Sequence, residues 1–307
     1  MTAVFLHEAG AGHRTPEGHP EQVARMAAVA RGLAGLEVDR REAPLGMDED
    51  ILRCHPAGFI ERIRSAAPQE GIVQLDPDTW MSPGTLEAAL RAVGGACAAV
   101  DLVVGGGARN AFVGMRPPGH HAEREKTMGF CLFGTVAIAA KRALDVHGLS
   151  RVAVVDFDVH HGNGTQDLLW DEARALMVTS QQMPLWPGTG DPSETGAHGQ
   201  VVNVPLAPGT GGAEMRAAYE AVVFPRLEAF KPQLILISAG FDAHAADPLA
   251  ELNWVEADYA WLTGRLCDLA DAHAKGRVVS VLEGGYDLGA LERSVAAHVG
   301  VLRERGA

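Results

Sequence analysis

Short apolar runs alternate with longer segments of mixed polar and apolar character along the chain. The runs are rich in Val, Ile and Leu, and most lack the every-other-residue polar pattern of a half-exposed strand. Continuous apolar runs of this kind are typical of parallel strands that are covered on both faces. Buried strands are therefore expected at residues 4–6, 111–115, 151–157, 175–180, 201–206, 233–239 and 277–282.

The segments between these runs predict helices and loops. Helices are indicated where Ala, Leu, Glu and Arg are frequent, at residues 85–100, 134–147, 213–230 and 255–274. A strand-then-helix order indicates βαβ units and a mostly parallel sheet. Gly, Pro and polar residues predict long loops of the kind that shape binding sites at residues 1–25, 66–84 and 181–200. Because no linker or repeat interrupts the strand signals, residues 1–307 are predicted to form a single α/β domain.

Composition and charge narrow the class of protein. The chain is 47% hydrophobic and 21% charged, which is enough apolar material for a sizeable core. Its first residues lack the pattern of a signal peptide, and no apolar run approaches about 18 residues, so no membrane span is expected. The formal net charge of −13 argues against a nucleic-acid partner and favours cationic ligands, although solubility explains it equally well. Scattered cysteines without a C-x-x-C pair indicate reduced, packed thiols in a cytoplasmic protein at Cys54, Cys97, Cys131 and Cys267.

Polar clusters follow four of the predicted strands at the point where each strand ends. In open parallel sheets, ligands bind beyond the carboxyl ends of the strands. The sequence therefore predicts one site to which all four clusters contribute. The clusters are Arg116–His121, Asp156–Gly164, Ala239–His244 and Glu283–Tyr286.

The second cluster predicts a metal site. Asp156, Asp158 and His160 are spaced by two, which would place them on one side of an extended segment. Leaving such groups unpaired at the end of a buried strand is costly, and a divalent cation removes that cost. Asp158 and His160 are the candidate ligands, and Asp156 could act behind them. Structural salt bridges or helix caps are disfavoured because no run of Lys or Arg lies nearby in the sequence. Asp242 can supply a third ligand, although an isolated aspartate would equally suit a helix cap. Two carboxylates and one imidazole suit Zn²⁺, and they are also compatible with Fe²⁺ or Co²⁺.

Three further residues suit acid–base and oxyanion chemistry. His120 and His121 follow a rigid Pro-Pro-Gly turn, and Asp156 and Asn163 are available to orient their rings. Tyr286 follows two glycines, which permit a close approach, so its hydroxyl could donate to a developing oxyanion. A histidine or tyrosine that occurred alone would be explained equally well as a packed core residue. A catalytic role is favoured because these residues occur in the same chain as the predicted metal site.

Seven motifs together resemble the histone deacetylase family, in order and spacing, from about residue 7 to residue 290. They are RPPGHHA (116–122), GFC (129–131), DFDVHHGNGT (156–165), PGTG (187–190), AGFDAH (239–244), DPL (247–249) and LEGGY (282–286). The resemblance implies a three-layer arginase-like fold, with a parallel sheet of about eight strands between helices. It also implies zinc held by Asp158, His160 and Asp242.

The same resemblance implies roles for the surrounding residues. His120 and His121 would be the acid/base pair, with Asp156 and Asn163 behind them, and Tyr286 would polarise the acyl carbonyl. The remaining implied residues form a substrate channel and a monovalent-cation site. Gly129, Phe130, Trp186 and Leu249 would line the channel, Asp78 would lie at its rim, Arg25 would lie near an internal acetate channel, and structural K⁺ would bind near Asp156, Asp158, His160 and Ser180.

Details of the motifs narrow the subclass. Asn163, His244 and Glu283 resemble the class II and bacterial branch of the family. A neutral Asn163 stabilises a protonated His121 less than an aspartate would, which suggests that His121 is neutral at rest and acts as the base. Leu249 occupies the position at which polyamine-selective relatives carry an acidic residue. Acyl-lysine or other simple acylated amines are therefore favoured over acylpolyamines.

The predicted activity is hydrolysis of an acylated amine by a water that zinc activates. An acylpolyamine or small-metabolite deacetylase of the acetoin-utilisation type is the alternative within the family. An arginase-like two-metal hydrolase would need more carboxylates at the strand ends. A non-catalytic acyl-lysine binding module is disfavoured because every expected catalytic position carries a reactive residue. An oligomer is compatible with all of these alternatives.

Overall fold

A central sheet of eight parallel strands organises the computed structural model, which describes residues 1–307. The strand order is β2–β1–β5–β10–β9–β6–β7–β8. All seven strand pairs are parallel. The predicted sheet is confirmed, and its strands are β1 (Thr2–Leu6), β2 (Asp39–Glu42), β5 (Asn110–Val113), β6 (Val152–Asp156), β7 (Ala175–Gln182), β8 (Val201–Leu206), β9 (Leu234–Ala239) and β10 (Val278–Leu282).

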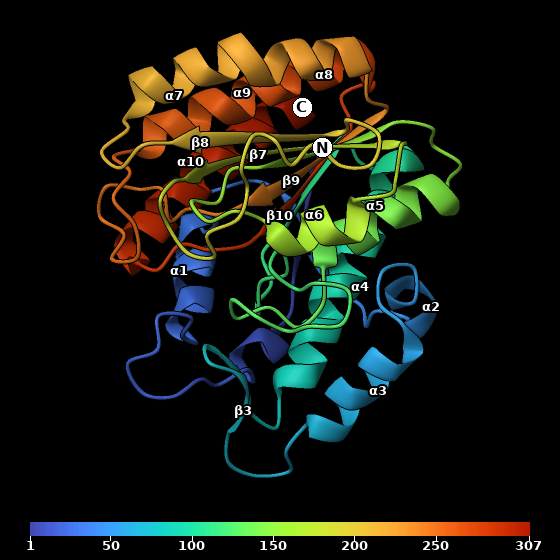
Figure 1. Ribbon diagram of the computed structural model, residues 1–307, viewed down its shortest axis with the longest axis vertical. Helices are drawn as coiled ribbons and strands as arrows, with labels where there is room; N and C mark the ends of the chain where they lie inside the picture. Colours follow the sequence, from blue (N-terminus) through green and yellow to red (C-terminus); the bar gives the residue numbers. More distant parts are fainter.

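Helices cover both faces of the sheet and make three layers (Figure 1). On one face lie α4 (Thr85–Val104) and α5 (Thr135–Asp145), and α3 (Ala57–Ala66) packs outside them. The other face is covered by α1 (Ala24–Gly32), α7 (Gly212–Ala218), a π-helical turn (Tyr219–Val223), α8 (Phe224–Phe230), α9 (Glu256–His273) and α10 (Leu288–Gly306). The shorter helices are a 3₁₀ turn (Glu8–Ala11), α2 (Asp48–Ile51) and α6 (Asn163–Leu169).

The continuous apolar runs follow from burial on both faces of the sheet. In β6, Val152 and Val154 belong to the core beneath α4 and α5. Ala153 and Val155 belong to the core on the opposite face of the sheet. Successive side chains of a strand point to opposite faces, so a strand between two helical layers needs apolar residues at every position.

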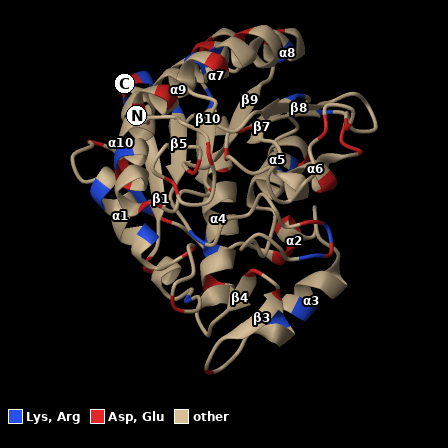
Figure 2. Cartoon of the chain, turned by 60° about the vertical axis from the view of Figure 1, so that its left-hand side comes forward, with Lys and Arg blue, Asp and Glu red and all other residues tan.

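The four strands that end in polar clusters are neighbours at the centre of the sheet. They lie in the order β5–β10–β9–β6. Because these strands are parallel, their carboxyl ends meet at one edge, and the four clusters meet there too. Figure 2 shows acidic segments at the centre of the molecule beside β10, whereas other acidic and basic residues are spread over the outer helices.

Several elements lie where the sequence predicted loops or no element. The expected loop at 66–84 contains an antiparallel hairpin of β3 (Val73–Asp76) and β4 (Thr79–Met81). The expected loop at 1–25 contains the 3₁₀ turn and the first residues of α1. Strand β2 was also not predicted, because its sequence DRRE is charged. It is an edge strand with exposed residues, and charges on an edge discourage pairing with other chains.

The helices and cysteines complete this picture. No helix combines the length and the apolar character that crossing a membrane requires. The four cysteines are all buried, free thiols, as predicted from their scattered positions.

Candidate active site and metal centre

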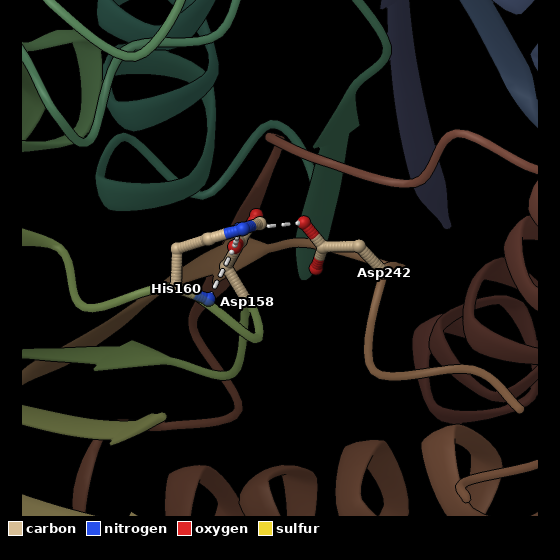
Figure 3. A group of neighbouring side chains, drawn as sticks. All are labelled: Asp158, His160 and Asp242. Atoms are coloured by element: carbon tan, nitrogen blue, oxygen red, sulfur yellow. Dashed lines mark hydrogen bonds and ion pairs between the residues drawn. The ribbon is translucent and has the colours of Figure 1, made fainter. Parts of the chain in front are cut away.

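Asp158, His160 and Asp242 form a buried group that could hold a metal ion (Figure 3). One ligand atom from each residue lies within 4.8 Å of the others. The Nδ1 atom of His160 is 3.2 Å from Asp158 Oδ1 and 3.2 Å from Asp242 Oδ2. The first two residues follow β6 and the third follows β9, so neighbouring strands deliver the three side chains to one point.

The local backbone differs from the extended segment that the sequence predicted. Strand β6 ends at Asp156, and residues 158–160 form bends. Asp156 Oδ1 accepts the backbone N–H of Asp158 at 3.1 Å, and Asp158 Oδ1 accepts that of His160 at 2.9 Å. Each aspartate thus stabilises the turn that follows it, as short acidic side chains do in loops. Asp156 consequently faces His120 and does not belong to the metal-binding group.

The surroundings of the two carboxylates fit a cation. A Cβ atom on Gly284 would lie 2.1 Å from Asp242 Oδ2, and one on Gly240 would lie 2.1 Å from Asp158 Oδ2. Only glycine therefore leaves room for both acids. Neither Asp158 nor Asp242 has an Arg or Lys partner, and both are at most 1% exposed. Two buried carboxylates without a basic partner need another source of positive charge, and a divalent cation is such a source.

The pKa values of His160 and Asp242 also indicate that the site fits a cation. Burial alone would lower the pKa of its imidazole, but hydrogen bonds and charge from Asp158 and Asp242 raise it to about 10. Burial and the charge of Asp158 raise the pKa of Asp242 to about 6. These three groups therefore attract positive charge to the space between them, and a cation bound there would take the place of the proton on Nδ1.

His120 lies behind the metal-binding group and is paired with Asp156. Its Nδ1 atom is 2.9 Å from Asp156 Oδ2, and its backbone N–H donates to Glu283 Oε2 at 3.1 Å. Burial would lower the pKa of His120, but Asp158 and Asp156 outweigh burial and hold that pKa well above its ordinary value. Burial in turn raises the pKa of Asp156. The His120–Asp156 pair thus favours a protonated ring that is held in one orientation.

His121 is paired with a neutral partner and lies in an opposite electrostatic environment. Its Nδ1 atom is 2.8 Å from Asn163 Oδ1, and Asn163 Nδ2 donates to Glu123 Oε1 at 2.8 Å. Burial, followed by the positive charges of His120 and His160, holds the pKa of His121 well below its ordinary value. The ring is therefore neutral near pH 7. With Asn163 accepting from Nδ1–H, its Nε2 atom is free to accept a proton.

A pocket of about 240 Å³ leads from the surface to His121 and His160. The Trp186 ring meets His121 edge-on at 4.7 Å between centroids, and the Phe130 ring meets Tyr286 edge-on at 5.8 Å. Aromatic walls of this kind suit an unbranched aliphatic chain. The pocket is lined by Asp78, His121, Gly129, Phe130, His160, Leu185, Trp186, Leu249 and Tyr286.

The wall formed by Gly129 and Phe130 has an unusual backbone. Both residues have positive φ, 58° and 69° respectively, and a Cβ atom on Gly129 would lie 2.3 Å from His121. Asp78 Oδ1 accepts the Gly129 N–H at 2.9 Å, and Thr79 Oγ1 accepts the Phe130 N–H at 3.1 Å. The β3–β4 hairpin therefore holds this wall in place, and Asp78 makes this contact within the protein as well as lining the pocket.

Tyr286 lines the same pocket as His121 and is held by Arg25. The Arg25 guanidinium lies 5.0 Å from the centre of the Tyr286 ring, and its Nε donates to the Gly285 carbonyl at 2.7 Å. Arg25 is fully buried behind Tyr286 and does not line the pocket. Burial and the charge of Asp242 hold the pKa of Tyr286 well above its ordinary value, so the hydroxyl stays protonated and able to donate.

Ser180 lies apart from the pocket, on β7 beside β6. Residues of the two strands pair up to Asp156 and Thr179, so Ser180 follows directly after the last pair. Its Oγ is 2.7 Å from the Tyr219 hydroxyl oxygen. The position is close to the end of β6, where the resemblance places K⁺, and the K⁺ site itself stays a prediction.

Four residues with contacts in the site were not assigned a role from the sequence. Leu185 lines the pocket, and Glu123 accepts from Asn163. Glu283 Oε2 accepts the N–H groups of both Gly119 and His120. Asp247 accepts the N–H of Tyr286. Glu283 and Asp247 belong to the LEGGY and DPL motifs, so the motifs marked them, but only three-dimensional contacts show what they touch.

Comparison with known proteins finds similar sequences and folds among deacetylases and an amidohydrolase. Residues 19–302 match the histone deacetylase domain. The histone deacetylase-like amidohydrolase of Pseudomonas aeruginosa is 40% identical over 282 residues, which cover 91% of this chain and 73% of that protein. A probable deacetylase of Archaeoglobus fulgidus is 37% identical over 297 residues, 94% of this chain and 82% of that protein. The crystal structure of the HDA15 HD domain superimposes with a TM-score of 0.93 at 31% identity, covering 99% of this chain and 90% of that chain.

The sheet, its helical layers and the site at its carboxyl edge thus define a hydrolase of the arginase-like fold that acts on amides. The chain belongs to the histone deacetylase family. Both the predicted family and the predicted fold are confirmed.

Proposed function

We propose that this protein is a zinc-dependent deacetylase that hydrolyses acetyl-lysine or a similar acylated amine. One observation carries the proposal. A pocket with aromatic walls is lined by His160 of the metal-binding group and also by His121 and Tyr286. The pocket suits an extended amine side chain, and the groups needed to hydrolyse its amide are part of the pocket lining.

Asp158, His160 and Asp242 would hold the metal. A tetrahedral Zn²⁺ site with two carboxylates and one imidazole keeps a position open, and Fe²⁺ accepts the same donor atoms. When bound, the ion supplies Lewis acidity for the acyl oxygen and for the attacking water. We also retain the expectation of K⁺ near Asp156, Asp158, His160 and Ser180 as a structural ion.

The remaining steps belong to side chains of the chain itself. His121 takes a proton from the attacking water at Nε2, while Asn163 holds its Nδ1–H. The Tyr286 hydroxyl donates a hydrogen bond to the oxyanion that forms when water adds to the acyl carbon, and it keeps its proton. His121 or His120 then protonates the amine nitrogen as the C–N bond breaks. The immediate products are a carboxylic acid and an amine, and proton exchange between them leaves a carboxylate and an ammonium ion, so atoms and charge balance.

Replacing Tyr286 by phenylalanine is expected to lower kcat by about 10²–10³-fold, because it removes one oxyanion donor and keeps the ring. Amine release from an acetyl-lysine peptide, acetylputrescine and acetylspermidine by the metal-loaded protein measures the effect. Tyr259→Phe is the matched control, since the buried Tyr259 hydroxyl has no hydrogen-bond partner and does not line the pocket. A Tyr286→Phe rate within a few-fold of the parent would remove Tyr286 from the mechanism.

Leu249 is proposed to favour acyl-lysine over acylpolyamines. It lines the pocket as an apolar residue and cannot attract a distal ammonium group. Leu249→Glu is expected to raise kcat/KM for acetylspermidine relative to the peptide by about 5-fold, which corresponds to the roughly 1 kcal/mol of a partly exposed ion pair. Leu249→Gln separates charge from polarity and should leave the ratio unchanged. A wild-type protein that already prefers the polyamines would instead support the acylpolyamine alternative.

A further inference from the structure

Asp247 joins two loops of the site through a buried carboxylate. Its Oδ2 atom accepts the backbone N–H of Tyr286 at 2.7 Å and that of Asp287 at 3.3 Å. Its Oδ1 atom accepts the N–H of Leu249 at 3.1 Å. Asp247 is only 7% exposed and has no Arg, Lys or His partner, so these three N–H groups are its whole set of hydrogen-bond donors.

The loop that carries Tyr286 needs such a tether. It follows β10 through Gly284 and Gly285, and Gly285 has a φ of 117°. Two glycines in succession leave the backbone many conformations, so the hydroxyl position is not set by the loop itself. Arg25 holds the Gly285 carbonyl from behind, at 2.7 Å. Asp247 holds the next N–H, so the Gly285–Tyr286 peptide unit is gripped at both of its polar ends.

The other oxygen of the Asp247 carboxylate, Oδ1, holds the pocket rim, which is the part of the pocket lining formed by Leu249. Leu249 lines the pocket, as does Tyr286, and both donate their backbone N–H groups to the same side chain. A turn fixes Asp247 itself, because its N–H donates to the His244 carbonyl at 2.8 Å. That turn leads back along the chain to the metal-binding Asp242. Movement of the rim, of the tyrosine and of this turn is therefore linked at one residue.

We propose that Asp247 is a positioning residue that sets the place of the Tyr286 hydroxyl and links it to the pocket rim at Leu249. This inference rests on the deacetylase function proposed above. A carboxylate is the side chain that fits the task, because both of its oxygens accept. An asparagine offers one acceptor oxygen and would present its NH₂ group to the remaining N–H donors, and an alanine offers none.

A double-mutant cycle tests the role. Asp247→Ala is expected to lower kcat by about 10- to 10²-fold, because displacement of a catalytic group by about 1 Å costs that much. Introduced into Tyr286→Phe, the same substitution is expected to change kcat by no more than about 2- to 3-fold, because the hydroxyl that it positions is already gone. Asp247→Asn, which can keep the Tyr286 and Asp287 bonds at the expense of Leu249, should recover part of kcat and show a raised KM.

Asp258→Ala is the matched control. Asp258 is 5% exposed and its Oδ2 atom also accepts a backbone N–H, that of Val255 at 3.0 Å, but it touches neither Tyr286 nor the pocket. It should lower Tm and leave kcat unchanged. Thermal unfolding of every variant shows whether it is folded, and the cycle is run with Asp247→Asn if Asp247→Ala does not fold.

The outcomes separate the two proposals. Loss of kcat that is the same size in the wild-type and Tyr286→Phe backgrounds would show that Asp247 acts only on stability and would overturn the inference. An unchanged kcat in Asp247→Ala would overturn it as well. In both cases the wild type remains an active deacetylase. A metal-loaded wild type that releases amine from none of the three substrates would instead overturn the proposed function, and the Asp247 inference with it.

Discussion

Replacing His160 by alanine is expected to abolish metal binding and, with it, deacetylation. The Nδ1 atom of His160 lies 3.2 Å from an oxygen of each of the two carboxylates, Asp158 and Asp242. His160 is therefore the residue that contacts both of the other members of the metal-binding group. Residues that only orient a metal ligand cost about 10- to 100-fold in affinity or activity when they are lost. Loss of a ligand itself should exceed that range. Metal content after dialysis, and amine release from an acetyl-lysine peptide, measure the two effects together.

His161→Ala is the matched control for this prediction. His161 is the next residue in the chain and is also buried, but its ring is held by Thr189 Oγ1 at 2.8 Å and Gln166 Oε1 at 3.1 Å. It is not part of the metal-binding group. The control should keep its metal. A His160→Ala protein that retains stoichiometric metal and normal activity would mean that the ion binds elsewhere.

The central part of the fold could be predicted because its strands are buried on both faces. All seven expected runs are strands of the sheet, and β6, with apolar residues in each of the two cores, shows why the pattern is so clear. The periphery gave weaker signals. The edge strand β2 is charged, and in the β3–β4 hairpin Val73 and Gln74 are exposed. Helix α10 was missed although Leu291, Val295, Val299 and Leu302 form a buried stripe at helical spacing.

The candidate site divides in the same way. The residue types at the strand ends indicated the chemistry, because parallel strands bring their carboxyl ends to one edge regardless of loop detail. The structure brings Asp158, His160 and Asp242 together, and it places Asp156 beside His120. Contacts that depend on how the loops pack could not be predicted from the residue types at the strand ends.

Two residues illustrate that limit. Arg25 was expected near an internal acetate channel, which stays a prediction, and its hydrogen bond to the Gly285 carbonyl behind Tyr286 was not predicted. Asp247 was visible only as the first residue of a DPL motif, and its three hydrogen bonds join segments that lie 39 or 40 residues apart as well as a near neighbour. Sequence spacing carries no information about such long-range contacts.

Replacing His121 by alanine is expected to lower kcat by about 10²–10⁴-fold, the range for loss of a general base. His121 lines the pocket and His120 does not, so His121 is the ring that can reach the attacking water. Burial and the charges of His120 and His160 hold the pKa of His121 well below its ordinary value, whereas His120 is held protonated by Asp158 and Asp156. A divalent cation nearby would lower the His121 pKa further. Only a neutral imidazole accepts a proton, which is why we propose His121 as the base.

Asn163→Asp tests the same assignment through pH. A base must be deprotonated, so kcat/KM falls as pH drops through the pKa of His121. An aspartate 2.8 Å from Nδ1, in place of the neutral amide, would stabilise the imidazolium and raise that pKa. The acidic limb of the profile should therefore move to higher pH in Asn163→Asp, whereas Gln166→Glu, which alters the partner of the adjacent His161, should leave it in place. An acidic limb that does not move in Asn163→Asp, or a His121→Ala protein with near-normal kcat, would assign the base to another group.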